Sequence, residues 1–333
     1  MKGGLIGPVC GRGGWTAWPD PGGVHMATVR MMLSQCRPLK AAYHGTRAAA
    51  FRLLLAISPV LLARVRYRLA WGRWPDFANP TTFDEKLLWL NLYWRHPLKT
   101  TCGDKCTMRE YVQQQGLGHL LPRLYRVYDS VDAIDFDALP RPCVLKCSHG
   151  CKCNVFCRLG ESLDVAAARR DLRRWMRTDY SRLLGELHYA SMTPRILCEK
   201  FLDDGSGGLP TDYKLYCFNG RVHCTLACSG RGINAKARYD FFDRAWAYLP
   251  YDRTSCAAQQ RVPQPKSYAD MLAAAETLSQ PFPFVRIDFY DIHGKPVLGE
   301  MTFTPCGCID SDLTPQAQQT LGRLLTLPPK YLP

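Results

Sequence analysis

The sequence predicts an α+β fold, built from mostly antiparallel strands with helices on one side. Two strand–turn–strand patterns indicate this. Residues 212–228 alternate around Asn219-Gly220, the dipeptide that most strongly signals a tight hairpin. Residues 284–305 form a second such pattern around Gly294. Helical segments precede and separate these hairpins, and this combination is typical of α+β domains.

Length and composition are those of a globular protein. The 333 residues suffice for one large domain or two ordinary ones, and 47% of them are hydrophobic. The 16 cysteines occur as singles and close pairs, without the framework of a small secreted module. Residues 1–25 lack the apolar segment of a signal peptide. These observations predict reduced thiols and a cytoplasmic protein.

The positive charge is concentrated in the N-terminal part. Of the net charge of +14, residues 1–75 supply +10, with eleven Lys and Arg against Asp20. Residues 1–46 are predicted to form a basic, poorly ordered arm, which could contact anionic lipid at the inner face of the membrane or be a solvated extension. The apolar stretch 48–62 is too short to span a membrane. The remaining charge is nearly balanced, so nucleic acid is not expected as a partner.

Residues 47–130 are predicted to form a helical region. Residues 47–69 indicate one or two basic amphipathic helices, broken at Ser58-Pro59. Thr82 and Glu85 have the spacing of a capping box and predict the start of the next helix. A further helix is expected over 104–116.

Strands dominate the prediction after this region. Residues 143–158 predict a strand, a turn and a strand, and residues 195–202 predict a buried strand. Between them, Ser162 is expected to cap a helix over 162–180. The arginines of this helix fit a solvated face or, alternatively, a site for an anionic glycan. Residues 267–278 predict another helix.

Charged residues share faces of the C-terminal hairpin. Arg286 alternates with Asp288 on the first strand, and Glu300 with Thr302 on the second. A three-residue loop over 292–294, ending in a bulge, would place Arg286 opposite Glu300. Asp288 would then lie diagonally beside them, whereas a two-residue turn would put the two sets on opposite faces. Clustered carboxylates favour Mg²⁺, and a surface ion pair between Arg286 and Glu300 is the alternative.

The segment "VLKCSHGCKCNVFC" (residues 144–157) carries four cysteines around a turn. Cysteines separated by three residues are compatible with zinc. However, alternation along a strand places Cys143 and Cys147 on the face opposite Lys146, where they suit a hydrophobic core. Lys146 would then face a cleft. The pattern therefore favours a phosphate-holding loop that carries structural thiols over a zinc knot or a redox site.

Six segments, in this order, resemble the TupA-like branch of the ATP-grasp superfamily. The resemblance covers roughly residues 47–327, and six segments in one order are far more specific than any one alone. The segments are "NPTTFDEKLLWLNLYWRHPL", "DKCTMREYV", "VLKCSHG", "ILCEKFL", "DYKLYCFNGRV" and "PFPFVRIDFYDIHGKPVLGEMTFTP".

This resemblance implies an ATP-grasp fold, in which two α+β subdomains clasp a nucleotide and a helical segment precedes them. It places the nucleotide-binding subdomain at 131–205 and the catalytic subdomain at 206–327. The implied reaction uses ATP and Mg²⁺. A carboxylate attacks the γ-phosphate to give an acyl phosphate and ADP, and an amine then displaces phosphate to form an amide.

The resemblance also assigns roles on the C-terminal strands. Asp288 and Glu300 correspond to Mg²⁺ ligands, together with Thr302, which stands where many ATP-grasp enzymes have an asparagine. Arg286 corresponds to the cation that stabilises the oxyanion. Lys214 is expected to face the γ-phosphate or the substrate acid.

Further residues are assigned to the nucleotide by the same resemblance. Lys105 and Lys146 correspond to lysines that reach its phosphates. The hinge whose backbone meets adenine comprises Glu199, Lys200, Phe201 and Leu202. His149 and Gly150, in the loop after the first strand, are expected to contact phosphate, although a turn histidine bonded to the backbone is an equal alternative.

Two positions depart from the family pattern. Cys151-Lys152-Cys153 replaces small, glycine-rich residues, which restricts backbone approach to phosphate, and the charge of Lys152 could offset that loss. Lys200 stands where an acidic residue often follows Glu199, which affects a ribose contact.

The sequence therefore predicts an ATP-dependent carboxylate–amine ligase of cell-surface polysaccharide assembly. Its substrates would be an amine and a small or glycan-linked carboxylate, such as a uronic acid or an acidic amino acid. Two alternatives stay open at this point. One is a zinc- or anion-binding protein on a degenerate ATP-grasp fold, and the other is a transferase of the polysaccharide pathway.

Overall fold

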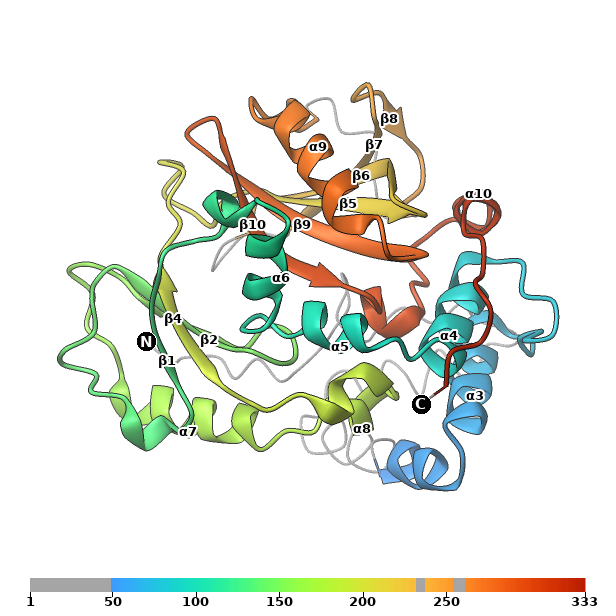
Figure 1. Ribbon diagram of the computed structural model, residues 1–333, viewed down its shortest axis with the longest axis horizontal. Coiled ribbons are helices and arrows are strands. Elements are labelled where there is room, and N and C mark those ends of the chain that lie inside the picture. The colour runs from blue at the N-terminus through green and yellow to red at the C-terminus, as the bar shows by residue number, and fades with distance from the viewer. Residues whose placement is uncertain (1–48, 232–236, 254–260, 333) are drawn as a thin grey trace, which may run out of the picture.

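The computed structural model describes residues 49–231, 237–253 and 261–332. There the chain forms two antiparallel sheets surrounded by helices, which confirms the α+β class (Figure 1). The predicted arm, residues 1–46, lies outside the described residues. No helix in the described ranges is both long enough and apolar enough to cross a membrane.

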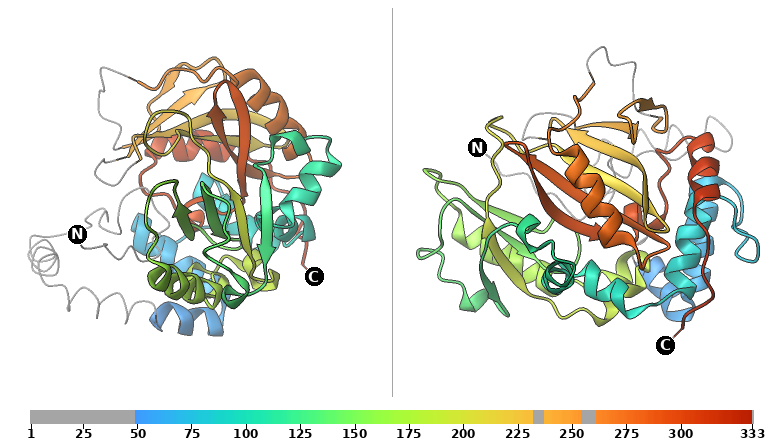
Figure 2. Two further views of the ribbon diagram at one scale, coloured as in Figure 1. Left: turned by 90° about the vertical axis from the view of Figure 1, so that its left-hand side faces the viewer. Right: turned by 45° about the horizontal axis from the view of Figure 1, so that its top comes forward.

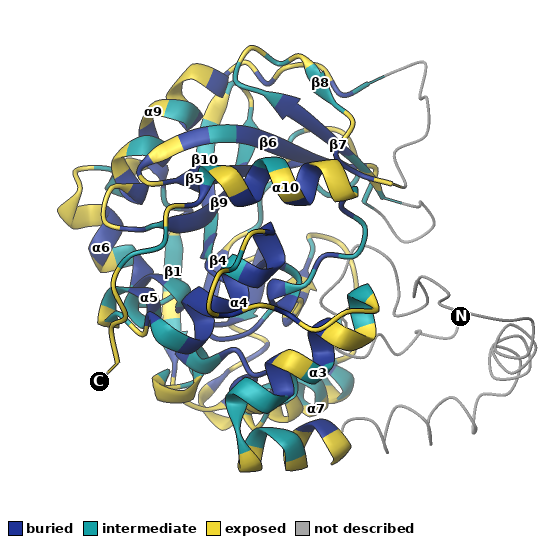
Figure 3. Cartoon of the chain, turned by 90° about the vertical axis from the view of Figure 1, so that its right-hand side faces the viewer, coloured by how far each residue is buried: buried dark blue, intermediate teal, exposed yellow. Residues whose placement is uncertain are grey.

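Four helices of the N-terminal region support the sheets. Ser58 separates a helical stretch at 49–57 from the next helix, so the predicted break is confirmed. The predicted capping box is present, because the Thr82 hydroxyl accepts from the Glu85 amide and the Glu85 carboxylate accepts from the Thr82 amide at 3.0 Å. The four helices are α3 (Pro59–Trp71), α4 (Phe83–Tyr93), α5 (Pro97–Gly103) and α6 (Met108–Gln114). Nearly all of α4 is buried (Figure 3).

The smaller sheet has four strands in the order β1-β4-β2-β3. Its strands are β1 (Leu124–Tyr128), β2 (Cys143–Cys147), β3 (Asn154–Cys157) and β4 (Ile196–Lys200). Helix α7 (Val165–Met176) packs against it and shares its hydrophobic core. The predicted cap of this helix is wrong. Asp164, not Ser162, accepts the hydrogen bond of Ala167 N at 2.8 Å, because it directly precedes the first helical turn.

The larger sheet has six strands in the order β10-β9-β5-β6-β7-β8. The predicted hairpin at Asn219-Gly220 is confirmed, since Phe218 pairs with Arg221 across it. The strands are β5 (Asp212–Phe218), β6 (Arg221–Ser229), β7 (Arg238–Asp243), β8 (Tyr248–Leu249), β9 (Phe284–Ile292) and β10 (Lys295–Thr302). Helices α9 (Tyr268–Ser279) and α10 (Pro315–Leu324) share a second hydrophobic core with this sheet and with α3 to α6.

Short helical elements complete the described chain. They are η1 (Gly118–Leu120), η2 (Val131–Ala133), α8 (Ser181–Leu184), η3 (Leu187–Ser191) and η4 (Pro305–Cys308). Figure 2 shows the two sheets as separate units, with helices beside each. The division agrees with the two separate cores. The exact subdomain boundaries at 131–205 and 206–327 stay a prediction.

Candidate active site

The hairpin of β9 and β10 differs from its predicted loop. The turn has two residues, His293 and Gly294, where three were expected. In an unbroken ladder, such a turn would put the carboxylates of the two strands on opposite faces. A bulge at Gly299 shifts the register by one residue and returns Glu300 to the face of Asp288.

The predicted pairing within this hairpin is therefore wrong, although the predicted cluster forms. Asp288, rather than Arg286, lies opposite Glu300, and Arg286 lies opposite Thr302. On the other side of β9, Lys214 of β5 lies opposite Asp288. Three neighbouring strands thus bring these five residues onto one face.

Asp288 lies at the centre of this network. Arg286 binds both of its oxygens, through Nε and Nη2, at 2.7 Å each. Lys214 Nζ lies 2.5 Å from Oδ2 of Asp288 and 2.5 Å from Oδ2 of Asp212. Burial disfavours the charge of Lys214, but the two carboxylates outweigh it and raise the pKa of this lysine. Asp288 is only 2% exposed, so these contacts fix its position.

Glu300 is the carboxylate that this face presents to the surroundings. Its side chain is 30% exposed, and Oε2 lies 3.2 Å from Lys105 Nζ. Its Oε1 accepts hydrogen bonds from Arg286 Nη2 at 3.5 Å and from Thr302 Oγ1 at 3.3 Å. Burial opposes ionisation, but the cations around it hold the pKa of Glu300 well below its usual range. Glu300 is therefore an anion at neutral pH.

The oxygen donors of this network suit Mg²⁺, which is usually held by one or two carboxylates together with phosphates and waters. Glu300 is the partly exposed carboxylate of the network, and the Thr302 hydroxyl bonds to it. Asp288 lies opposite Glu300 on the adjacent strand, with its oxygens bound by Arg286 and Lys214. Over the described ranges, no three His, Cys, Asp or Glu side chains form a group able to hold a metal ion by themselves. A cation here would need additional oxygens, as the phosphates of a nucleotide supply.

Lys105 joins the network to the β2–β3 loop. It lies between α5 and α6, and its Nζ donates to the carbonyl oxygen of Gly150 at 2.9 Å as well as contacting Glu300. Gly150 has a φ of 77°, and a Cβ there would lie 2.4 Å from the ring of Tyr180. This close approach requires glycine. Burial works against the charge of Lys105, but Glu300 raises its pKa. One lysine thus ties the two sheets together.

The other predicted loop residues lie apart from this contact. His149 is buried, with its ring edge-on to Tyr180 at a centroid distance of 5.3 Å. Burial lowers the pKa of His149. Lys152 is exposed and has a φ of 59°. Its side chain is therefore open to solvent.

A second charged cluster lies on the smaller sheet. Lys146 Nζ is 2.9 Å from Oε2 of Glu199, and Arg109 Nη1 of α6 is 3.0 Å from Oε1. Two cations thus hold one carboxylate, which leaves a net positive charge. Lys146 points away from the core, as the alternation along β2 predicts.

The predicted hinge comprises the last two residues of β4 and the two residues that follow it. The backbone amide of Lys200 donates to Arg123 at 2.9 Å, and that of Phe201 donates to Pro142 at 3.3 Å. The side chain of Lys200 is exposed, whereas Phe201 and Leu202 are half-buried. The ring of Phe201 packs edge-on against Phe156.

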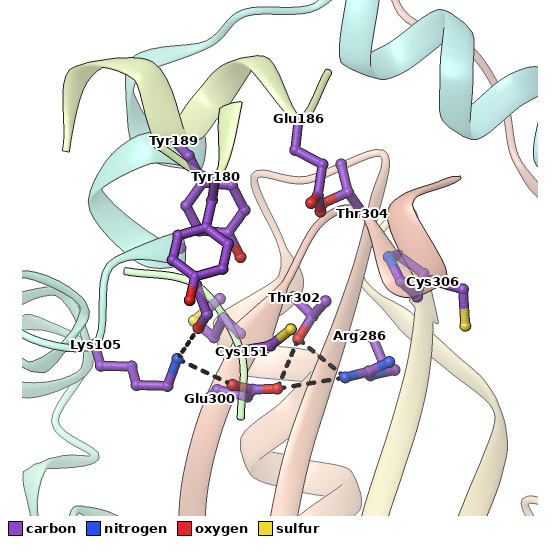
Figure 4. A pocket seen from close by; sticks show the side chains of 14 residues that line it. Lys105, Cys151, Tyr180, Glu186, Tyr189, Arg286, Glu300, Thr302, Thr304 and Cys306 are labelled. Carbon is purple, nitrogen blue, oxygen red and sulfur yellow. Dashed lines mark hydrogen bonds and ion pairs between the residues drawn. The ribbon is translucent and has the colours of Figure 1, made fainter. Parts of the chain in front are cut away.

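A pocket lies between the larger sheet, the β2–β3 loop and the segment around α8 (Figure 4). Five of the predicted residues line it: Lys105, Gly150, Arg286, Glu300 and Thr302. The cluster of Lys146 and Glu199, the hinge, Lys214 and Asp288 are not part of its lining. The remaining lining residues were not predicted: Gly103, Cys151, Tyr180, Glu186, Tyr189, Met301, Thr304, Pro305 and Cys306.

Glu186 is the most informative of the unpredicted residues. It follows Gly185 between α8 and η3, is 7% exposed, and accepts a hydrogen bond from Thr304 Oγ1 at 2.5 Å. Burial raises the pKa of Glu186 to about 7. The Thr304 hydroxyl and the nearby cations lower this pKa, but their combined effect is smaller than that of burial. Its sequence signal is weak. It is the only acid between Asp179 and Glu199, in an apolar surrounding.

The cysteines of the smaller sheet are buried free thiols. Cys143, Cys147, Cys157 and Cys198 lie in its hydrophobic core. Cys153 Sγ lies 2.7 Å from the Tyr180 hydroxyl, which itself belongs to this core. Their surroundings are those of small apolar side chains.

The fold and the site place this chain among α+β proteins in which two antiparallel sheets meet at a pocket lined by acidic and basic residues. A family model for TupA-like ATPgrasp matches residues 85–326, more than half of the chain. The chain therefore belongs to the TupA-like ATP-grasp family, and the predicted ATP-grasp fold is confirmed. The ATP-grasp ligases are thus its superfamily, while the individual site roles stay predictions.

Several solved structures are similar at low identity. One is a D-alanine–D-alanine ligase from Bacillus anthracis complexed with ATP, with 13% identity, a TM-score of 0.42 and coverage of 68% of this chain and 66% of the ligase. An L-amino acid ligase from Bacillus licheniformis has 15% identity, a TM-score of 0.37 and coverage of 62% and 42%. D-cycloserine synthetase DcsG has 16% identity, a TM-score of 0.39 and coverage of 69% and 71%. No curated protein matches the chain.

Proposed function

We propose that this protein is an ADP-forming carboxylate–amine ligase that activates a carboxylic acid with ATP. The observation that carries the proposal is the network on the larger sheet. Glu300, an anion in a pocket, is held by Arg286 from its own sheet and by Lys105, which also binds the β2–β3 loop. Such a junction of charges suits a phosphoryl group between two subdomains.

The proposed first step is attack of the substrate carboxylate on the γ-phosphate, which gives an acyl phosphate and ADP. Arg286 and Lys105 face the pocket and would stabilise the negative charge that develops there. Asp288, Glu300 and Thr302 would hold Mg²⁺, which neutralises phosphate charge when bound. Lys214 is held by Asp212 and Asp288, which supports a positioning role for it rather than direct contact with phosphate.

The remaining nucleotide contacts are proposed on the smaller sheet. Lys146 belongs to the net positive cluster with Arg109 and Glu199, which favours an anionic ligand nearby. The hinge at the end of β4 would supply backbone contacts to adenine. Gly150, whose carbonyl binds Lys105, brings the loop to the phosphate end of the site.

The biological setting is proposed from family membership and charge. We infer a role in the assembly of a cell-surface polysaccharide, at a step that takes place in the cytoplasm. The carboxylate substrate would be a uronic acid or an acidic amino acid. Peripheral contact with anionic membrane is supported by the exposed Arg64 and Arg68 of α3, which carries no acid. Sedimentation with anionic vesicles, compared with sedimentation with neutral vesicles, tests this contact.

The first test is calorimetric titration of the reduced protein with ADP, with and without Mg²⁺. The proposal expects Mg²⁺-dependent binding at about one nucleotide per chain. A screen of acids follows, with ATP, Mg²⁺ and hydroxylamine, in which an acyl phosphate is trapped as a hydroxamate. Absence of nucleotide binding by the folded protein would refute the proposal.

Glu300→Gln is the sharpest variant. It keeps the shape of the side chain but removes the charge that Lys105 and Arg286 hold. We expect ADP release to fall by at least about 1000-fold, with an unchanged unfolding transition. Glu161→Gln changes an exposed carboxylate that does not line the pocket and serves as the matched control. A fully active Glu300→Gln variant would contradict the proposal.

A further inference from the structure

One end of the pocket carries a carboxylate that the activation step leaves unused. Figure 4 shows Glu186 beside Thr304, separated from the pair of Lys105 and Glu300. Thr304 follows Thr302 by two residues, which is about 6 to 7 Å in extended chain. Thr302 bonds to Arg286 and Glu300, whereas Thr304 bonds to Glu186. Two neighbouring threonines thus mark two adjacent parts of one pocket.

The surroundings of Glu186 keep its carboxylate directed at the pocket. Thr304 donates its hydroxyl hydrogen to Oε1 at 2.5 Å and fixes the orientation. The nearby Arg66 guanidinium hydrogen-bonds to the carbonyl oxygens of Leu184 and Gly307. The Lys99 ammonium donates to Leu90 O at 3.2 Å. Arg66 and Lys99 contribute electrostatic attraction to the Glu186 carboxylate, whereas the hydrogen bond to Glu186 comes from the neutral Thr304 hydroxyl.

The walls beside this carboxylate are aromatic. Tyr180 and Tyr189 line the pocket, with ring centroids 6.1 Å apart. A cationic group of a ligand is favoured by aromatic side chains in the pocket wall and by a carboxylate at the end of the pocket. An ammonium group meets both requirements.

We propose that Glu186 and Thr304 form the acceptor subsite, in which Glu186 binds a primary ammonium group and removes one proton from it. This inference rests on the ligase function proposed above. The proton passes from the ammonium nitrogen to Glu186 and leaves a neutral amine. The amine nitrogen then forms a bond to the acyl carbon, the bond from that carbon to the phosphate oxygen breaks, and the second proton of the nitrogen leaves with the phosphate.

The titration behaviour of Glu186 agrees with this role. Its pKa is raised to about 7 by burial, and a general base works best when its pKa lies near the working pH. The charged and titratable groups around it come from every neighbouring element: Arg66 of α3, Lys99 of α5, His188 of η3 and Cys308 of η4.

The test compares two small nucleophiles in the presence of ATP, Mg²⁺ and an acid that yields a hydroxamate. Hydroxylamine is largely uncharged at neutral pH and needs no base, whereas ammonium must lose a proton before it attacks. For Glu186→Gln we expect hydroxamate formation within about twofold of the unaltered protein and primary-amide formation from ammonium chloride about 100-fold lower. The carboxamide oxygen of Gln can still accept the Thr304 hydrogen bond. Glu161→Gln is the control and should change neither rate.

Any other pattern of the two rates contradicts the proposed role of Glu186. If both nucleophiles are impaired equally, Glu186 acts in activation or in folding, and the acceptor proposal is overturned. If neither is impaired, or if the unaltered protein uses hydroxylamine but not ammonium, it is also overturned. If the unaltered protein forms no hydroxamate with any acid, the ligase proposal itself has failed and the acceptor subsite falls with it.

Discussion

Two glutamates line the same pocket and differ in their electrostatic surroundings. Glu300 lies 3.2 Å from the Lys105 ammonium and 3.5 Å from the Arg286 guanidinium, and its pKa is held far below the usual range. Glu186 is hydrogen-bonded by the Thr304 hydroxyl, and its pKa is raised to about 7. Direct contact with cations decides the first case, and burial decides the second.

This difference separates two kinds of chemistry within one pocket. A carboxylate that stays ionised suits a metal ion or the positioning of cations around phosphate. A carboxylate that exchanges a proton near neutral pH suits acid–base work. The proposed roles of Glu300 and Glu186 follow from the difference between their pKa values. Experiments that remove the cause of this difference therefore test both roles together.

After Glu300→Gln, the largest expected effect comes from Lys105→Met. This change removes the nearest cation of Glu300 and the hydrogen bond to Gly150 O, the two contacts by which Lys105 links the sheets at the pocket. We expect ADP release to fall by at least about 100-fold and the ADP dissociation constant to rise. Steady-state assays and calorimetry measure the two effects.

Lys266→Met is the matched control, because Lys266 is exposed and lies outside the network. It should leave both quantities unchanged. A Lys105→Met protein with normal nucleotide binding and turnover would show that the contact between the sheets has no functional part, and the contrast between the two glutamates would then lose its meaning.

A smaller effect is expected from Gly299→Ala. A Cβ at Gly299 would lie 3.2 Å from the carbonyl oxygen of Asp288 and 3.0 Å from the ring of Tyr290, so these neighbours must give way by a few tenths of an ångström. We expect a loss of about 2 to 3 kcal/mol in the free energy of unfolding and a fall in ADP release, because the bulge turns Glu300 toward Asp288. Urea unfolding and turnover assays measure the two losses.

Gly208→Ala provides the comparison for this change. The Cβ at Gly208 would meet only ordinary contacts, the nearest at 3.7 Å, and its effect should be within about 0.5 kcal/mol. If Gly299→Ala behaves like Gly208→Ala, the bulge does not control the position of Glu300.

The same bulge shows what the sequence could and could not predict. Alternation correctly placed Arg286 with Asp288 and Glu300 with Thr302, because side-chain direction along a strand has a period of two. The turn was predicted with three residues and has two. The shorter turn and the bulge at Gly299 each move the register by one residue. Together they move the pairing by two residues, which restores the predicted face but not the predicted partners. The cluster was right, but its pairing depended on a backbone irregularity with no clear sequence pattern.

Glu186 illustrates a different limit. The capping box at Thr82 and the hairpin at Asn219-Gly220 are local and were predicted correctly. The position of Glu186 depends on Thr304, which is 118 residues away along the chain. Such contacts arise only when two sheets and their connecting segments pack together. Its burial, and therefore its raised pKa, is a property of the folded protein.

The last expected effect concerns stability alone and is a change in its pH dependence in Glu186→Gln. The carboxyl of Glu186 titrates at about 7 in the folded protein against an ordinary value of 4.5, so between these pH values the folded chain keeps a proton that the unfolded chain has lost. Stability therefore falls as pH rises through this window, by at most about 3 kcal/mol. The glutamine variant lacks this loss and should lose less stability between about pH 5 and about pH 8. Asp84, whose pKa is also raised to about 7, contributes equally in both proteins and cancels in the comparison. Urea unfolding at the two pH values measures the difference. Equal pH dependence in both proteins would mean that Glu186 titrates normally, and it could then no longer be contrasted with Glu300 as the proton-exchanging carboxylate of the pocket.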